Sequence, residues 1–234
     1  MIRLHVIAEG PTEETFVNRI LVPHLAQFGV YADTHCITTR RDNRRNRTYR
    51  GGLLDYRHVE KDIDLWVRQE QGRPDVWFTT MIDLYAFPKD DYSPYSDTIR
   101  AISEPVKKVK ALEQSMKERL SLVNFIPYVQ LHEFEALVLC APERLSSVYT
   151  ERRNAVHQLC DEIRHLDPEA INEGRETAPS KRIIRYIPEY EDQKIVAGIL
   201  IVEDIGLPLL RERCPHFNEW VSRLEQLGTL LQSK

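Results

Sequence analysis

The sequence predicts an α/β fold with a mostly parallel sheet flanked by helices, and three observations support this. Short runs that suit strands occur at residues 4–8, 32–38, 76–82 and 125–131, and the first of them is apolar and broken by a Gly-Pro pair. Stretches with apolar residues at helical spacing separate them, which favours a parallel sheet with helices on both faces. After about residue 142 the pattern becomes helical. We expect an α/β core over residues 1–142, and a mostly helical portion over residues 143–234 packed on it, because no Gly/Ser-rich spacer separates them.

The first predicted elements are the strand at residues 4–8 and a helix that follows it. A Gly-Pro pair breaks the apolar run, after which Thr12 is placed to cap the helix, with Glu13 and Glu14 in its first turn. Pro23 is expected to kink or restart this helix, because proline disrupts a helix interior. The apolar stripe of the helix consists of Phe16, Val17, Ile20 and Leu21.

Three more strands and two more helices are predicted in the rest of the core, and a third helix is predicted at the C-terminus. The run at residues 76–82 is the clearest strand, since it is rich in β-favouring residues and ends at Asp83. Pro127 in the run at residues 125–131 favours an edge position or a strand start. The helices are indicated by Val59, Ile63, Trp66 and Val67, by Val106, Val109, Leu112, Met116 and Leu120, and at the C-terminus by Phe217, Trp220, Val221, Leu224 and Leu227.

Composition excludes several classes of protein. The chain does not begin with a basic-then-apolar signal peptide, and no apolar run approaches the ~20 residues of a membrane span. The four cysteines lack zinc-site spacing and suggest reduced thiols. Phosphate-binding loops, the serine hydrolase elbow and the zinc protease motif are also missing. The sequence therefore predicts a soluble, cytoplasmic protein with no membrane partner.

The first candidate site is an acidic cluster formed by Glu9, Glu13 and Asp83. Glu9 and Asp83 each follow a predicted strand, and ligands of parallel α/β sheets bind at the carboxyl ends of strands. If the two strands are neighbours, the carboxylates converge, and such oxygen ligands select Mg²⁺ or Mn²⁺. The alternatives are that Glu13 complements the helix dipole and that Asp83 caps a turn.

The second candidate is Glu135, which has aliphatic residues at its helical neighbour positions. A buried acid of this kind needs a cation, a metal or a buried donor. Glu133 and His132 are the alternatives on neighbouring faces, and a surface salt bridge is equally compatible with the pattern.

The third and fourth candidates are basic. Thr177 is expected to cap a helix with Pro179 in its first turn. Lys181 and Arg182 in that turn oppose the helix dipole, which suggests a phosphate or carboxylate partner.

The fourth candidate, a loop at residues 40–50, contains six arginines and one acid, although the net charge of the chain is −4. It suits contact with a phosphate backbone, and solvated basic residues are the alternative for both segments. The arginines of the loop are Arg40, Arg41, Arg44, Arg45, Arg47 and Arg50.

The chain resembles a Toprim-superfamily family of domains of unknown function, of the DUF4276 type. It is similar in its opening segment to the Toprim domain of overcoming-lysogenization-defect (OLD) nucleases. The segment that resembles the OLD opening is Ile7-Ala8-Glu9-Gly10-Pro11-Thr12-Glu13-Glu14-Thr15-Phe16-Val17. The stretches that match the family span nearly the whole chain, at residues 9–25, 80–85, 126–137, 172–174, 177–182 and 214–217.

The resemblance implies a Toprim-like, Rossmann-like fold with a four-stranded sheet and a metal site at the strand ends. It assigns Glu9 as metal ligand and general acid or base, Glu13 as a second acid, and Asp83 as the first aspartate of an Asp-x-Asp motif. Tyr85 departs from that motif, which puts a second metal in doubt. Glu135 then becomes a candidate for the missing ligand, and Lys181 resembles a late lysine of OLD-type sites.

The resulting hypothesis is a nuclease that uses Mg²⁺ or Mn²⁺ to hydrolyse phosphodiester bonds in DNA or RNA. In this hypothesis Glu9, Asp83, Glu135 and Lys181 are catalytic, and the arginines of residues 40–50 hold the nucleic acid. Relatives occur beside ATPases in bacterial antiphage and toxin-like systems, which suggests a defence effector with an ATPase partner. The alternative is a regulatory or partner-binding module with weak or no catalysis. The oligomeric state is left open, a homodimer included.

Overall fold

The computed structural model describes residues 1–42, 47–50, 55–70, 73–85, 87–171, 174 and 176–231. These residues form two compact units. The first unit contains Met1–Gln130 and Trp220–Lys234, and the second contains Leu131–Glu219. In the described part of the chain, no helix has both the length and the apolar character needed to cross a membrane.

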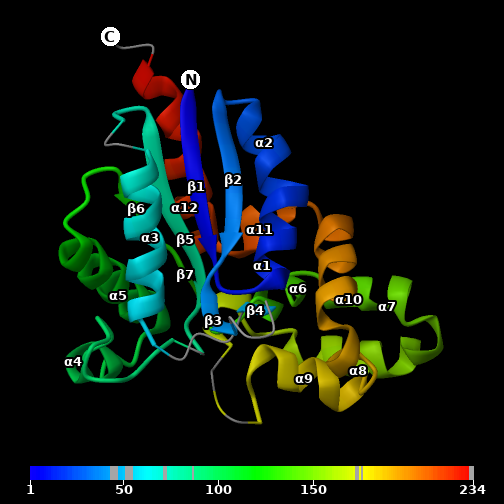
Figure 1. Ribbon diagram of the computed structural model, residues 1–234. Helices are drawn as coiled ribbons and strands as arrows, with labels where there is room; N and C mark the ends of the chain where they lie inside the picture. The colour runs from blue at the N-terminus through cyan, green and yellow to red at the C-terminus, as the bar shows by residue number, and fades with distance from the viewer. Residues whose placement is uncertain are drawn as a thin grey trace. The chain divides into compact units, whose positions relative to one another are not determined.

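The first unit is built on a parallel sheet, which confirms the predicted α/β class. Its strand order is β2-β1-β5-β6, with β7 also paired to β5, and every pair in this sheet is parallel (Figure 1). The strands are β1 (Ile2–Ala8), β2 (Val30–Cys36), β5 (Val76–Asp83), β6 (Phe125–Ile126) and β7 (Val129–Gln130). A separate antiparallel pair is formed by β3 (Thr38–Asp42) and β4 (Arg47–Arg50).

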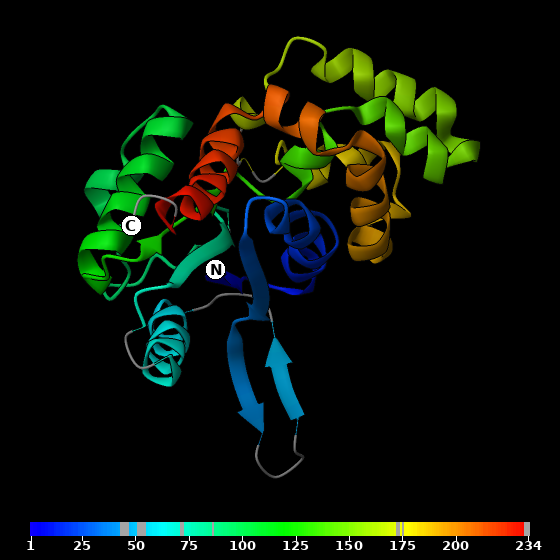
Figure 2. The same cartoon turned by 90° about the horizontal axis from the view of Figure 1, so that it is seen from above.

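Helices cover both faces of this sheet, as predicted. Figure 2 shows α3 on one face and α1, α2 and α12 on the opposite face. A π-helical turn at Val17–Leu21 joins α1 to α2, and α2 then starts with Pro23 in its first turn. The predicted restart of the helix at this proline is therefore confirmed. The helices are α1 (Pro11–Phe16), α2 (Val22–Ala26), α3 (Arg57–Gln69), α4 (Asp97–Arg100), α5 (Pro105–Leu120) and α12 (Pro215–Gln226).

The second unit is helical, which confirms the predicted helical C-terminal portion. Its α-helices are α6 (Glu135–Val138), α7 (Leu145–Val148), α8 (Arg153–Ile163), α9 (Pro179–Tyr186), α10 (Tyr190–Ile205) and α11 (Leu207–Arg213), followed by the start of α12. Short 3-10 turns lie at Pro142–Arg144, Thr150–Arg152 and Pro168–Ala170 in this unit, and at Leu227–Leu231 in the first.

The predicted strand at residues 125–131 is divided into two short strands, so the sheet has five strands rather than four. The cause is Pro127, which lies between β6 and β7 and has no N–H to donate. The buried hydroxyl of Thr80 on β5 compensates at the next residue. It donates to the carbonyl of Tyr128 at 2.9 Å and accepts the N–H of Tyr128 at 3.0 Å.

Substitution of Thr80 by Val is expected to lower the free energy of unfolding by about 2–4 kcal/mol, because two buried backbone groups of Tyr128 would lose their partner. Valine has nearly the same shape, so the change isolates the hydroxyl. Urea denaturation measures the effect. Exposed Thr98 provides the control, and Thr98→Val is expected to stay within about 0.5 kcal/mol of the unchanged protein. Equal effects of the two substitutions would contradict the proposed role of Thr80.

The C-terminal helix packs on the same strand. Trp220 is buried on α12, where its indole N–H donates to the Thr79 hydroxyl at 2.8 Å. Its ring stacks on Tyr128, with centroids 4.1 Å apart. The predicted apolar face of this helix is confirmed, because Phe217, Trp220, Val221 and Leu224 are all buried.

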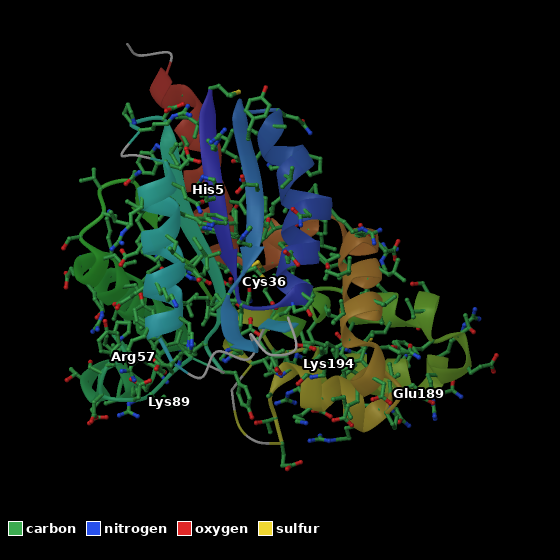
Figure 3. All side chains as sticks on the ribbon, in the orientation of Figure 1. His5, Cys36, Arg57, Lys89, Glu189 and Lys194 are labelled. Atoms are coloured by element: carbon green, nitrogen blue, oxygen red, sulfur yellow. The ribbon has the colours of Figure 1, made fainter. Side chains whose placement is uncertain are left out.

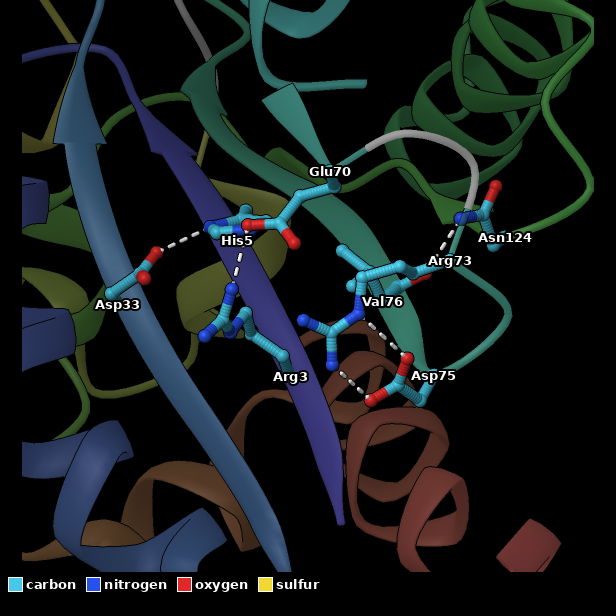
Figure 4. A network of polar contacts seen from close by, with 8 residues as sticks. All are labelled: Arg3, His5, Asp33, Glu70, Arg73, Asp75, Val76 and Asn124. Atoms are coloured by element: carbon cyan, nitrogen blue, oxygen red, sulfur yellow. Dashed lines mark hydrogen bonds and ion pairs between the residues drawn. The ribbon is translucent and has the colours of Figure 1, made fainter. Parts of the chain in front are cut away.

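A polar network near the start of the strands ties β1 and β2 to the end of α3 (Figure 4). His5 is buried on β1 between two carboxylates, with Nδ1 2.6 Å from Asp33 and Nε2 3.2 Å from Glu70. Arg3 donates to the same Glu70 carboxylate at 2.8 Å. The network lies at the N-terminal half of β1, whereas Glu9 follows its C-terminal end, so we interpret it as a structural clamp.

Candidate functional site

The strands that carry Glu9 and Asp83 are direct neighbours, which was the condition for these residues to converge. β1 and β5 are parallel, with Ala8 opposite Met81. The N–H of Glu9 continues the ladder by donating to the carbonyl of Met81 at 3.0 Å. Glu9 therefore follows the carboxyl end of β1, while Asp83 is the last residue of β5.

The Glu9 carboxylate is fixed beside Asp83 by a backbone hydrogen bond. The N–H of Asp83 donates to Oε2 of Glu9 at 3.0 Å, a contact between residues 74 positions apart in the chain. Glu9 is 9% exposed and Asp83 is half-buried. Two carboxylates thus lie at one edge of the sheet, one oriented by the backbone of the other.

Glu13 is engaged at the start of α1. Its side chain is buried, and Oε2 accepts the N–H of Gly10 at 3.0 Å. Gly10 is the N-cap of the helix and Pro11 its first residue, so the predicted cap at Thr12 is wrong by two positions. The reason is that the carboxylate of Glu13 reaches back to the Gly10 amide. The contact agrees with the structural alternative for Glu13, that it serves the helix start.

Among the described residues, few side chains at this edge could act as metal ligands. Tyr85, which stands where the resemblance to Toprim domains would place a second acid, is 44% exposed. Among the residues that the structure describes, no group of three or more His, Cys, Asp or Glu side chains is arranged to hold a metal ion.

In the second unit, the stretch around Glu133 meets the start of α9. The N–H of Ser180 donates to Oε1 of Glu133 at 2.7 Å, and both residues are buried. Pro179 begins α9, as expected, but its N-cap is Ala178 rather than Thr177. A carboxylate at a helix start offsets the positive end of the helix dipole. Glu133 therefore serves the start of α9 through its backbone, and the phosphate or carboxylate partner expected for Lys181 stays a prediction.

Glu135 is a buried carboxylate with a shifted pKa. Its side chain lies 3.7 Å from the amine of Lys194 on α10, which Figure 3 marks. Burial and the nearby Glu133 raise the pKa of Glu135 to about 7, although Lys194 and Tyr190 act in the opposite direction. Glu135 is buried, and of the partners expected for a buried acid, a cation, a metal or a buried donor, the structure places a cation beside it.

The two basic residues in the first turn of α9, Lys181 and Arg182, differ in their surroundings. Lys181 is exposed, whereas Arg182 is half-buried. Arg182 forms an ion pair with Glu162 on α8 and donates to the carbonyl of Thr177 at 2.9 Å. Arg182 therefore holds α9 against α8, which leaves Lys181 as the solvent-facing cation of this turn.

A third buried carboxylate of the second unit, Glu169, was missed by the sequence analysis. It accepts the N–H groups of His216 and Phe217 at 2.9 and 3.0 Å, at the start of α12. Burial raises its pKa, although the two backbone hydrogen bonds lower it. No local pattern indicated this role, because the partners lie 47 and 48 positions further along the chain.

The arginine-rich segment is a strand pair in part, which corrects the expected loop. Arg40 and Arg41 lie on β3 and pair with Tyr49 and Thr48 on β4. The loop prediction was based on the charges of these residues, and charge does not show which backbone segments pair. Arg47 and Arg50 are the end residues of β4. Arg44 and Arg45 lie outside the described residues.

A family model with the description "Domain of unknown function (DUF4276)" matches residues 8–225 of the chain. The match includes both carboxylates at the sheet edge and all the candidate residues of the second unit. No curated protein and no solved structure matches the sequence.

Proposed function

Because the chain belongs to the DUF4276 family of domains of unknown function, its activity has to be inferred from its own site, and we propose that it is a divalent-metal-dependent nuclease acting on DNA or RNA. The observation that carries the proposal is the pairing of Glu9 and Asp83 at the carboxyl ends of two adjacent parallel strands. This edge is where α/β sheets place their ligands. The same pairing supports a relationship to Toprim domains, which we include in the proposal.

The donor set fits Mg²⁺ or Mn²⁺. Both groups are hard carboxylate oxygens, and Mg²⁺ in proteins is commonly held by one or two carboxylates together with water and substrate phosphates. Glu9 and Asp83 would hold the ion, with Glu13 as the nearest further acid along the chain. When bound, the ion would polarise the scissile phosphate and generate a nucleophilic hydroxide from water.

The chain's own residues have separate tasks in this proposal. The Asp83 amide fixes the Glu9 carboxylate, so the site is oriented before substrate arrives. We assign nucleic-acid binding to the arginines of residues 40–50. The roles that the resemblance implies for Glu135 and Lys181, a further acid and a cation that offsets phosphoryl charge, stay predictions. A cytoplasmic antiphage effector that works with an ATPase is the proposed setting.

A second candidate function is a regulatory or partner-binding module without catalysis. Two observations favour it. Exposed Tyr85 stands where a second acid would be, and the carboxylates of Glu9 and Glu13 each accept a backbone N–H, which gives both a structural role.

A cleavage panel tests the nuclease proposal. The protein would be incubated with Mg²⁺ or Mn²⁺ and with tRNA, single-stranded DNA and duplex DNA, alone and together with the product of a neighbouring gene. We expect cleavage of at least one substrate, and its abolition by a chelator. Metal binding without turnover on any substrate would instead support the binding module.

Metal binding itself has a separate readout. Mn²⁺ is expected to raise the unfolding temperature of the unchanged protein, because a ligand that binds only the folded state stabilises it. The shift should be lost in Glu9→Gln and in Asp83→Asn, and kept in Asp91→Asn, which changes an exposed aspartate in the loop after β5. A full Mn²⁺ shift in the first two variants would refute the metal site in both candidate functions.

A further inference from the structure

Two buried thiols face each other in the second unit. The Sγ atoms of Cys140 and Cys214 are 3.2 Å apart, although the residues are 74 positions apart in the sequence. Cys140 follows α6, and Cys214 lies between α11 and α12. Their exposed fractions are 3% and 0%. All four cysteines of the chain are free thiols, so this pair is reduced in the structure.

We propose that Cys140 and Cys214 form a site of reversible oxidation, at which an intramolecular disulfide connects the end of α6 to the junction of α11 and α12. A disulfide bond is about 2.05 Å long, so the two sulfur atoms have to approach by only about 1.2 Å. Close packing in this region already holds the two side chains together, which gives each thiol a high effective concentration for the other. This inference does not depend on the nuclease proposal.

The reaction is a two-electron oxidation by a small disulfide such as oxidised glutathione. One protein thiolate attacks a sulfur of the reagent, which breaks the reagent's S–S bond and releases one glutathione thiolate. The second protein thiolate then displaces the other glutathione from the mixed disulfide and forms the Cys140–Cys214 bond. Two protein thiols lose two protons and two electrons, and one oxidised glutathione becomes two glutathione molecules.

Burial determines the order and the speed of these steps. The contact with Cys140 and burial raise the pKa of the Cys214 thiol well above its usual range, so Cys214 is a poor first nucleophile. Cys140 is slightly exposed, and we expect its thiolate to attack the oxidised glutathione first. Because both thiols are buried, oxidation needs local opening of the packed helices and should be slow compared with that of an exposed cysteine.

The experiment uses the full chain, incubated with excess oxidised glutathione until the intact mass stops changing. We expect a loss of two hydrogen atoms, a Cys140–Cys214 link in the peptide map, and a rise of the unfolding temperature on the order of 5 °C or more. Dithiothreitol should reverse all three changes. The variants Cys140→Ala and Cys214→Ala should lose the link, whereas Cys36→Ala and Cys160→Ala should keep it.

Three results would overturn the inference. The first is a final mass without the loss of two hydrogen atoms. The second is a peptide map in which Cys160 or Cys36 takes part in the link. The third is a link that persists in Cys140→Ala or Cys214→Ala. Peptide mapping separates these cases, because it identifies which cysteines are linked. Cys36 belongs to the first unit, and Cys160 is half-buried on α8 of the second.

Discussion

Replacement of Glu9 by Gln is expected to lower metal-dependent cleavage by about 100- to 1000-fold, because a bound cation contributes several kcal/mol to the transition state and each 1.36 kcal/mol is tenfold in rate. Glutamine removes the charge but keeps a carbonyl oxygen that can accept the Asp83 N–H. The fold should therefore survive, and the unfolding temperature without metal should change little. Initial cleavage rates on the best substrate of the panel measure the effect.

The companion variants make this prediction specific. Asp83→Asn should have a comparable effect, because it removes the other carboxylate of the pair. Glu14→Gln is the control, since Glu14 lies in the same first turn of α1 and is not assigned to the site. Unchanged cleavage by Glu9→Gln would refute the assignment of Glu9. Loss of cleavage in all three variants would point to damage at the start of α1 instead.

Replacement of Glu135 by Gln is expected to stabilise the protein at high pH. In the folded protein, burial and Glu133 raise the pKa of Glu135 from 4.5 to about 7. A carboxyl group with a raised folded pKa contributes stability that is fully present below the unfolded value of 4.5 and is lost as the pH rises through about 7. Above that pH, ionised Glu135 destabilises the fold by about 3 kcal/mol relative to low pH.

The measurement is the difference in unfolding free energy between Glu135→Gln and the unchanged protein, taken from urea denaturation at several pH values. This difference should increase in favour of the variant by about 3 kcal/mol between pH ~4 and pH ~8. Glu212→Gln is the control, because Glu212 is exposed on α11 of the same unit. A difference that stays constant across this range would show that Glu135 titrates normally.

Glu135 is a buried carboxyl group with a raised pKa, and groups with perturbed pKa values cluster at functional sites. The ion pair with Lys194 recovers only part of the cost of burial, since the pKa remains raised. Glu135 therefore remains the candidate of the second unit with the strongest physical reason for a functional role.

The sheet and its acidic edge were accessible from the sequence because they depend on local patterns. The apolar run before Glu9 and the β-rich run before Asp83 predict strands, and a residue that follows a parallel strand is placed at its carboxyl edge. The division at Pro127 could be anticipated in part, since proline weakens a strand wherever it occurs. The role of the Thr80 hydroxyl, which bonds to the chain beside the interruption, could not be anticipated. A threonine fits a strand pattern whatever its hydroxyl contacts.

The helix starts show the limit of local patterns. The sequence places caps at Thr12 and Thr177, because threonine is a common N-cap. The structure uses carboxylates instead, from Glu13 within the same turn and from Glu133 at a distance of 47 positions. A remote cap leaves no trace in the residues around the helix, so propensity alone selects the wrong residue.

The sequence by itself determined the α/β class, the helical C-terminal portion and the positions of Glu9 and Asp83 at strand ends, because hydrophobic periodicity and the order of elements along the chain are local features of the residue pattern. Only the tertiary structure decided that the two strands are neighbours and that the Asp83 amide orients Glu9. It also decided that Glu133 and Glu169 serve helix starts, and that Cys140 faces Cys214. These contacts join residues 47 to 74 positions apart, and burial of the whole chain rather than any local preference brings them together.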